Sequence, residues 1–193
     1  MTVGFVVERD GVIYAAIDSS QTTFEDPGRF MQTKLLWINK NMLMLCAGEL
    51  RPLKILRDLA GSYSNRLATL ELASDFIVDW LDKLSAKEDA VSDCLLCGFD
   101  VESKPQAFFI QRRLGEKSSK AAVDIGRTKI IGDVPENQDS SAFEGQIDQA
   151  IADGISPYQA MSEAIYKLME SSTELAPPVV HDIIRASIIQ RFS

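Results

Sequence analysis

The feature that most constrains the fold is a set of four short apolar segments within residues 1–48. The first two meet at Asp10-Gly11, a dipeptide typical of two-residue hairpin turns. The last two meet at residues 39–41, an Asn-Lys-Asn turn, and the polar residues 19–33 separate the two pairs. This pattern predicts that the chain begins with two β-hairpins.

Three polar residues mark the edges of these strands. Thr2 begins the first, Asp18 follows the second and Lys34 precedes the third. If Met1 is removed, the α-amino group of Thr2 can act as the base for its own hydroxyl, which makes the threonine a nucleophile. A lysine ammonium favours the developing alkoxide, and an aspartate keeps that lysine charged. We therefore expect Lys34 within hydrogen-bonding distance of both the Thr2 hydroxyl and the Asp18 carboxylate. Gly48, which ends the fourth segment, has no side chain to block its N–H from an oxyanion.

The spacing of Thr2, Asp18 and Lys34 resembles that of the catalytic residues of proteasome β-type subunits, which are N-terminal-nucleophile hydrolases. Gly48 falls where this family has its oxyanion-hole glycine, and the match needs no gap. The resemblance implies a threonine-type endopeptidase that cleaves peptide bonds through Thr2. It also implies a homo-oligomeric ring, which in the smaller bacterial members works under a ring ATPase.

The same resemblance suggests further site residues. Asp133 lies where the family has a glycine–serine–glycine segment, and it is either a hydrogen-bond acceptor for the α-amino group or a turn residue. Glu170 is either part of an acid–serine pair near the site or the end of a helix. We expect the substrate cleft beside Thr2 to be lined by Gln21, Gln32, Leu36, Cys46 and Leu50.

The rest of the chain alternates between helical and strand patterns. Apolar spacing predicts helices over residues 49–63 and 70–84, the second with a strong stripe. Strands are predicted over 94–99, 106–111, 121–125 and 128–132, with a polar loop over 114–120. Two more helices follow, over 141–152 with Ser140 as its cap and Glu144 nearby, and over 157–171 with Ser156 as its cap. A last strand is predicted over 182–190. This order predicts an α+β protein, and the family resemblance implies a four-layer αββα sandwich of two antiparallel sheets between helix pairs.

Composition limits the function classes. At 193 residues the chain fits one domain covering residues 1–193. A net charge of −8 disfavours nucleic acid as a partner. No apolar run is long enough for a membrane helix, and no secretory signal is visible, so we expect a cytoplasmic protein with no membrane partner.

The cysteines give little sign of a metal or redox centre. Cys94 and Cys97 form a C-x-x-C motif, but residues three apart in a strand point to opposite faces. There is no second cysteine pair, and the only histidine, His181, is remote in sequence. We expect buried thiols, no metal and no cofactor, and we expect His181 to be structural.

Two other functions fit the same residues. The acyl-enzyme can be resolved by an amine, which gives amidase, transpeptidase or ligase chemistry. Alternatively, the chain is an inactive structural subunit: if Met1 is retained, Thr2 has no free amine and the mechanism fails.

Overall fold

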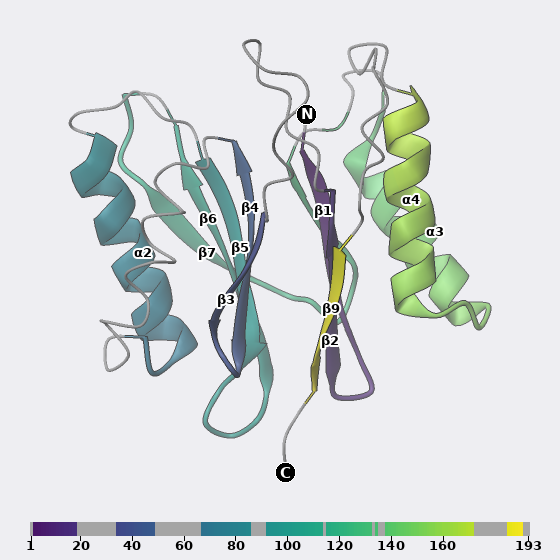
Figure 1. Cartoon of the computed structure of the whole chain (residues 1–193), viewed down its shortest axis with the longest axis horizontal. Coiled ribbons are helices and arrows are strands. Elements are labelled where there is room, and N and C mark those ends of the chain that lie inside the picture. The colour runs from purple at the N-terminus through teal and green to yellow at the C-terminus, as the bar shows by residue number, and fades with distance from the viewer. Residues whose placement is uncertain are drawn as a thin grey trace.

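The protein is described from a computed structural model that covers residues 2–18, 34–48, 67–85, 92–113, 115–132, 134, 138–171 and 185–190. The described part is an α+β fold of two antiparallel sheets and three helices (Figure 1). The four-stranded sheet has the order β8-β1-β2-β9, with bounds β1 Val3–Arg9, β2 Val12–Ile17, β8 Lys129–Gly132 and β9 Arg185–Gln190. The five-stranded sheet has the order β3-β4-β5-β6-β7, with bounds β3 Leu35–Asn39, β4 Met42–Gly48, β5 Ser92–Phe99, β6 Pro105–Arg112 and β7 Ser119–Val123.

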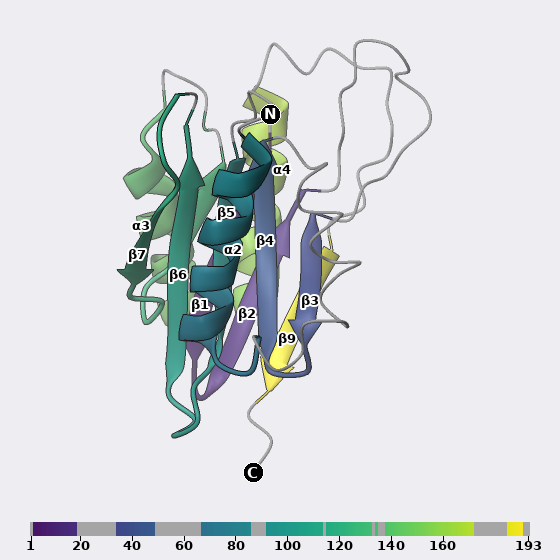
Figure 2. The same cartoon turned by 90° about the vertical axis from the view of Figure 1, so that its left-hand side faces the viewer.

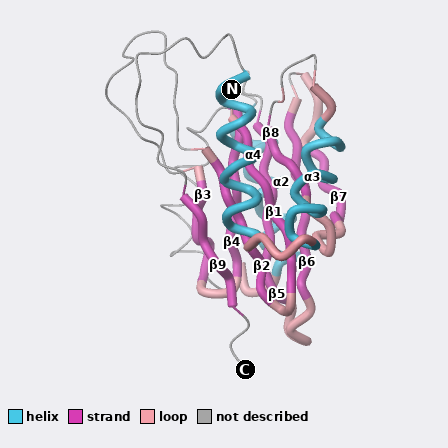
Figure 3. The backbone as a smooth tube through the Cα atoms, turned by 90° about the vertical axis from the view of Figure 1, so that its right-hand side faces the viewer, coloured by secondary structure: helices cyan, strands magenta, loops and turns pink. Residues whose placement is uncertain are grey.

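The helices cover the outer faces of the sheets. Helix α2, Leu70–Ser85, lies along the outer face of the five-stranded sheet (Figure 2). Helices α3, Ser140–Ala152, and α4, Pro157–Ser171, lie along the outer face of the four-stranded sheet (Figure 3). No helix within the described ranges is long and apolar enough to cross a membrane.

Three apolar clusters hold these elements together. One lies between α2 and the five-stranded sheet, one between the two sheets, and one between the four-stranded sheet and α3 with α4. Strand β1 contributes to two of them, because Val3, Phe5 and Val7 face the helices while Val6 faces the other sheet. A strand buried on both faces reads as a continuous apolar run, which is why β1 shows no polar alternation.

Both hairpins predicted from the sequence are confirmed. Strands β1 and β2 pair antiparallel through Asp10 and Gly11, whose φ angles of 54° and 75° are those of a left-handed two-residue turn. Strands β3 and β4 pair around Lys40 and Asn41, with a register shift between Trp37 and Asn39. The predicted helices over 70–84 and 157–171 are confirmed, as is the Ser156 cap, whose Oγ accepts from Gln159 N at 3.3 Å.

Some predicted boundaries were wrong. The cap of α3 is Asp139 and not Ser140, because the Asp139 carboxylate accepts from both Ser141 N and Ser141 Oγ. A carboxylate also suits the positive end of the helix dipole. The predicted loop over 114–120 is shorter, since β7 already begins at Ser119 and pairs with Gln111. The predicted helix over 49–63 lies outside the described residues.

Candidate active site

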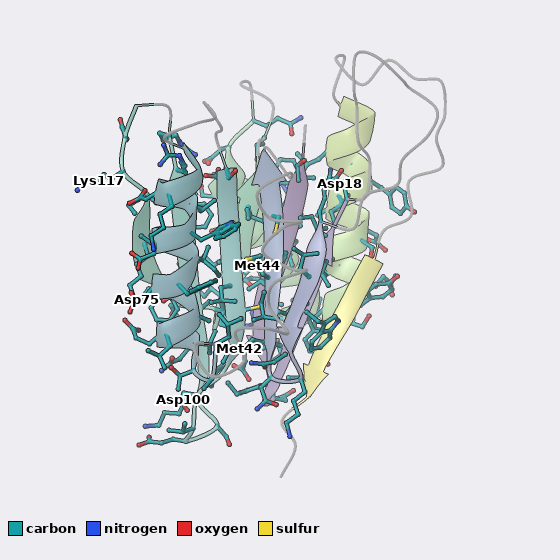
Figure 4. All side chains as sticks on the ribbon, turned by 60° about the vertical axis from the view of Figure 1, so that its left-hand side comes forward. Asp18, Met42, Met44, Asp75, Asp100 and Lys117 are labelled. Carbon is teal, nitrogen blue, oxygen red and sulfur yellow. The ribbon has the colours of Figure 1, made fainter. Side chains whose placement is uncertain are left out.

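The candidate residues of the two hairpins gather at one end of the molecule. Because each hairpin is antiparallel, the start of β1 lies beside the end of β2, and the start of β3 beside the end of β4. Figure 4 shows Asp18 at this end of the strands and Asp100 at the opposite end. Thr2, Asp18, Lys34 and Gly48 therefore stand at neighbouring strand ends, two in each sheet.

Asp18 connects the start of β1 to the other sheet. Its backbone N donates to Val3 O at 3.0 Å, while its side-chain Oδ1 accepts from Val3 N at 2.7 Å. In a regular antiparallel pair the backbone carbonyl would take that second bond, so here the carboxylate takes its place. The residue after Thr2 is thus fixed to Asp18 by both of its backbone polar groups.

The other carboxylate oxygen of Asp18 binds Lys34. Lys34 Nζ donates to Asp18 Oδ2 at 2.7 Å, and the two residues are only 3% and 2% exposed. One carboxylate therefore holds both the backbone beside Thr2 and the ammonium of Lys34. The contact between Asp18 and Lys34 that we expected from the sequence is confirmed.

A buried ion pair of this kind is sensitive to the loss of either partner. Removing both charges can be neutral, but removing one leaves an uncompensated buried charge, at a cost of about 3–5 kcal/mol. Stability alone does not require a charged pair here, since packed apolar residues are often as good. The pair holds the Lys34 ammonium at a fixed point.

The expected second contact of Lys34 is not made. Among the residues the structure describes, no hydrogen bond joins Lys34 Nζ to Thr2 Oγ. In this chain Thr2 N is still the amide of the Met1–Thr2 peptide bond. Side-chain alternation along β1 puts Thr2 on the side of Gly4 and Val6, and Val6 faces the other sheet.

Gly132 holds the other side of Thr2. It pairs with Val3 at the end of β8 and has a φ of +95°. A Cβ built on Gly132 would lie 1.9 Å from the carbonyl oxygen of Thr2, far inside any permitted contact. Only glycine allows this approach, for both steric and conformational reasons.

Gly48 is exposed at the end of β4 and pairs with Ser92 of β5. Its φ of +84° lies in the left-handed region, which glycine adopts without strain. The conformation explains why glycine stands here, and its role as an oxyanion donor stays a prediction.

The expected substrate residues divide into two groups. Leu36 and Cys46 are 4% and 1% exposed and belong to the cluster between the five-stranded sheet and α2. Both side chains pack toward α2 and almost no part of either is accessible, so the structure does not support the expectation that they line a cleft beside Thr2. Gln21, Gln32 and Leu50 lie outside the described residues, as does Asp133. Glu170 is in α4, but its side chain is outside the description too.

Sequence reasoning missed two close contacts. The contact of Gly132 with Thr2 depends on the pairing of β8 with β1, which no local sequence pattern indicates. The second is between cysteines: Cys46 and Cys94 are directly opposite each other in the pairing of β4 with β5. The expectation for Cys94 and Cys97 is confirmed, because they lie in different apolar clusters on opposite faces of β5.

Comparison with known proteins does not identify the chain. A scan against models of protein families finds no match. A search of curated proteins finds no significant match either.

The geometry defines what this end of the molecule can do. Neighbouring strand ends carry three features. Thr2 precedes β1, whose first residue is fixed to Asp18; the buried Lys34 ammonium is held by the Asp18 carboxylate; and Gly48 has an exposed backbone. A hydroxyl nucleophile, a fixed positive charge and a backbone donor are the parts that acyl transfer needs.

Proposed function

We propose that the protein is a threonine-type endopeptidase of the proteasome β-type kind, with Thr2 as its nucleophile after removal of Met1. The single observation that carries the proposal is the bridging carboxylate of Asp18, which binds Val3 N and Lys34 Nζ at 2.7 Å each. This carboxylate holds a buried ammonium and also fixes the residue that follows Thr2, which supports a role of Lys34 at the Thr2 hydroxyl.

The proposed reaction uses residues of this chain alone. The free α-amino group of Thr2, with a pKa of about 8 in an unperturbed terminus, takes the proton of the Thr2 hydroxyl. Lys34 stabilises the alkoxide, and the Gly48 N–H stabilises the tetrahedral oxyanion. Water then opens the acyl-enzyme.

The fold that we propose is the four-layer αββα sandwich of this family. Its support is the order of the three apolar clusters, with α2 outside one sheet and α3 and α4 outside the other.

The proposed assembly is a homo-oligomeric ring that encloses the sites, and a ring ATPase is its proposed partner. Both rest on the resemblance, as does the expectation of a cytoplasmic protein. Sedimentation at micromolar concentration checks the ring: we expect a closed oligomer, and a monomer would contradict the proposal.

The experiment that tests the function combines mass and activity. The protein is prepared with Thr2 as its first residue, verified by intact mass, and incubated with a library of unstructured peptides. We expect cleavage by the wild type, retained cleavage by Thr2→Ser, and none by Thr2→Ala. Cleavage by Thr2→Ala at the wild-type rate would remove Thr2 from the mechanism, and cleavage by protein that retains Met1 would remove its amine. A competing amine in the same assay, read by product mass, separates hydrolysis from amide transfer.

A further inference from the structure

The cysteines nearest the candidate site form a pair whose geometry follows from the strand pairing. Cys46 N donates to Lys34 O at 2.8 Å, so the backbone polar groups of Cys46 point toward β3. In an antiparallel sheet both polar groups of a residue point to the same neighbouring strand. Toward β5, where Cys94 is its direct partner, Cys46 therefore occupies a non-hydrogen-bonded position.

This position brings two side chains close together. Partners in a non-hydrogen-bonded pair have Cα atoms about 4.5 Å apart, and disulfides span about 4.4–6.8 Å. Both thiols are free, and both belong to the cluster between the sheet and α2. The expected Cα separation of the pair therefore falls within the range that a disulfide spans, so no large backbone movement is needed.

We propose that Cys46 and Cys94 are a site of oxidative modification, which closes to an intramolecular disulfide under a diffusible two-electron oxidant, and that closure displaces Lys34. Each thiol loses one hydrogen as the sulfur–sulfur bond forms. The two electrons and two protons reduce hydrogen peroxide to two water molecules, or a small disulfide to two thiols. The consequence for activity rests on the proposed function, whereas the disulfide itself does not.

The cysteine pair is connected to the candidate active site through one backbone hydrogen bond, between Cys46 and Lys34. Cys46 holds Lys34 O on one side and faces Cys94 on the other. A disulfide fixes the separation of the two Cβ atoms at about 3.5–4.5 Å, somewhat less than the usual separation of cross-strand partners. Drawing Cys46 toward β5 moves the strand to which Lys34 is bonded, and a displacement of about 1 Å at a catalytic group can reduce turnover about 100-fold.

Burial makes the reaction slow. It raises the pKa of the Cys46 thiol well above its ordinary value, and the adjacent Cys94 thiol adds to this rise. Since the thiolate is the reactive form, closure at neutral pH needs sustained exposure to oxidant. Cys97 is an internal control, because burial also raises its pKa, to about 12, but it faces the cluster between the sheets.

The test uses the full chain with Thr2 as its first residue. The folded protein is held in hydrogen peroxide for several hours, then denatured, alkylated and mapped by peptide mass. We expect a crosslinked peptide joining Cys46 to Cys94, with Cys97 alkylated, in the wild type and in Cys97→Ala. In Cys94→Ala we expect no crosslink. Alkylation of all three thiols after oxidation of the wild type, or oxidation confined to Cys97, would overturn the proposal.

Peptide cleavage by the same samples tests the consequence. We expect closure to lower cleavage at least tenfold, dithiothreitol to restore it, and oxidised Cys94→Ala to keep its untreated rate. Full closure with unchanged cleavage would overturn the link to Lys34 and leave the proposed function standing. If the reduced protein cleaves nothing, the proposed function and this link both fail, and the peptide map still decides whether the thiols pair.

Discussion

Two lysines of this protein make ion pairs of the same length in very different places. Lys34 binds Asp18 at 2.7 Å where β2 ends and β3 begins, and Lys120 of β7 binds Glu71 of α2 at 2.7 Å. The side chains of the first pair are 2% and 3% exposed, whereas those of the second are 25% and 62% exposed.

The difference shows that burial, and not distance, decides what an ion pair does. Lys120 has several partners, since it also binds Asp75 and lies 5.2 Å from the centre of the Phe108 ring. Water screens this cluster, and pairs of this kind contribute about 0.2–1 kcal/mol. Lys34 has one carboxylate partner in the described part of the chain, and that carboxylate also fixes the strand beside Thr2.

The largest expected effect follows from removing the buried ammonium. In Lys34→Ala the carboxylate of Asp18 loses its counter-charge, so we expect a loss of about 3–5 kcal/mol in unfolding free energy. Cleavage should fall about 100- to 1000-fold, as when an oxyanion donor is lost. Lys34→Arg should restore charge but not activity, because the planar guanidinium cannot occupy the same point. Denaturant unfolding and peptide cleavage measure the two effects, and full activity in folded Lys34→Ala would contradict the account.

A smaller effect is expected from Asp18→Asn. The amide oxygen can still accept from Val3 N, but the charge that holds Lys34 is gone. Cleavage should therefore fall between the wild type and Lys34→Ala, by about 10- to 100-fold in a folded protein. Steady-state kinetics of Asp18→Asn and Lys34→Ala measures the two losses of cleavage. A greater loss in Asp18→Asn than in Lys34→Ala would show that Asp18 has a role beyond holding Lys34.

The contact of Gly132 with the carbonyl of Thr2 can be tested with two glycines of nearly equal φ. Gly132 and Gly154 have φ angles of +95° and +92°, but a Cβ meets Thr2 O only at Gly132 and has open space at Gly154. Both alanine variants carry the same backbone strain, of about 1–2 kcal/mol. We expect Gly132→Ala alone to reduce cleavage, about tenfold, through displacement of Thr2. Equal kinetics in the two variants would mean that the contact with Thr2 is irrelevant.

The smallest effect is expected at the exposed pair. Burial lowers the pKa of Lys120, but the hydrogen bonds and charges of Asp75 and Glu71 outweigh it, so the pKa is raised. Because the pKa is raised in the folded state, the charged lysine stabilises the fold. This stabilisation is fully present below the unfolded-state pKa of about 10.4, and it is lost as pH rises through the higher folded-state pKa. Lys120→Ala should lower the free energy of unfolding by less than about 1 kcal/mol at neutral pH, and this difference should shrink as salt is added. Cleavage should be unchanged. Thermal unfolding at two salt concentrations measures this, and a loss as large as that of Lys34→Ala would remove the distinction between the two pairs.

The sequence predicted the parts of this arrangement that depend on local pattern. The turns at Asp10-Gly11 and around Lys40 fixed the two hairpins. The contact between Asp18 and Lys34 joins the two sheets, and it was expected from the chemistry of the trio and the family resemblance and not from a local pattern. The contacts that need long-range pairing were not predictable in the same way. Gly132 reaches Thr2 only because β8 adds to the edge of β1, and Cys94 reaches Cys46 only through the register of β5.

Local competition also limited the prediction. Asp139, Ser140 and Ser141 are all plausible helix caps by residue type, and the choice of Asp139 depends on its two bonds to Ser141. Glu144, which we expected near the cap, instead accepts a bond from Ile130 N of β8. The Glu144 carboxylate therefore accepts a hydrogen bond from a backbone N–H of the edge strand β8, a contact that sequence spacing does not indicate.

The most direct test of the central claim is covalent capture of the nucleophile. Protein that begins at Thr2 and protein that retains Met1 are treated with the same peptide bearing an electrophilic carboxyl terminus, then mapped by mass. The account predicts an adduct on Thr2 in the first protein, none in the second, and a strongly reduced yield in Lys34→Ala. An adduct at another residue, or no adduct on the folded protein that begins at Thr2, would contradict it.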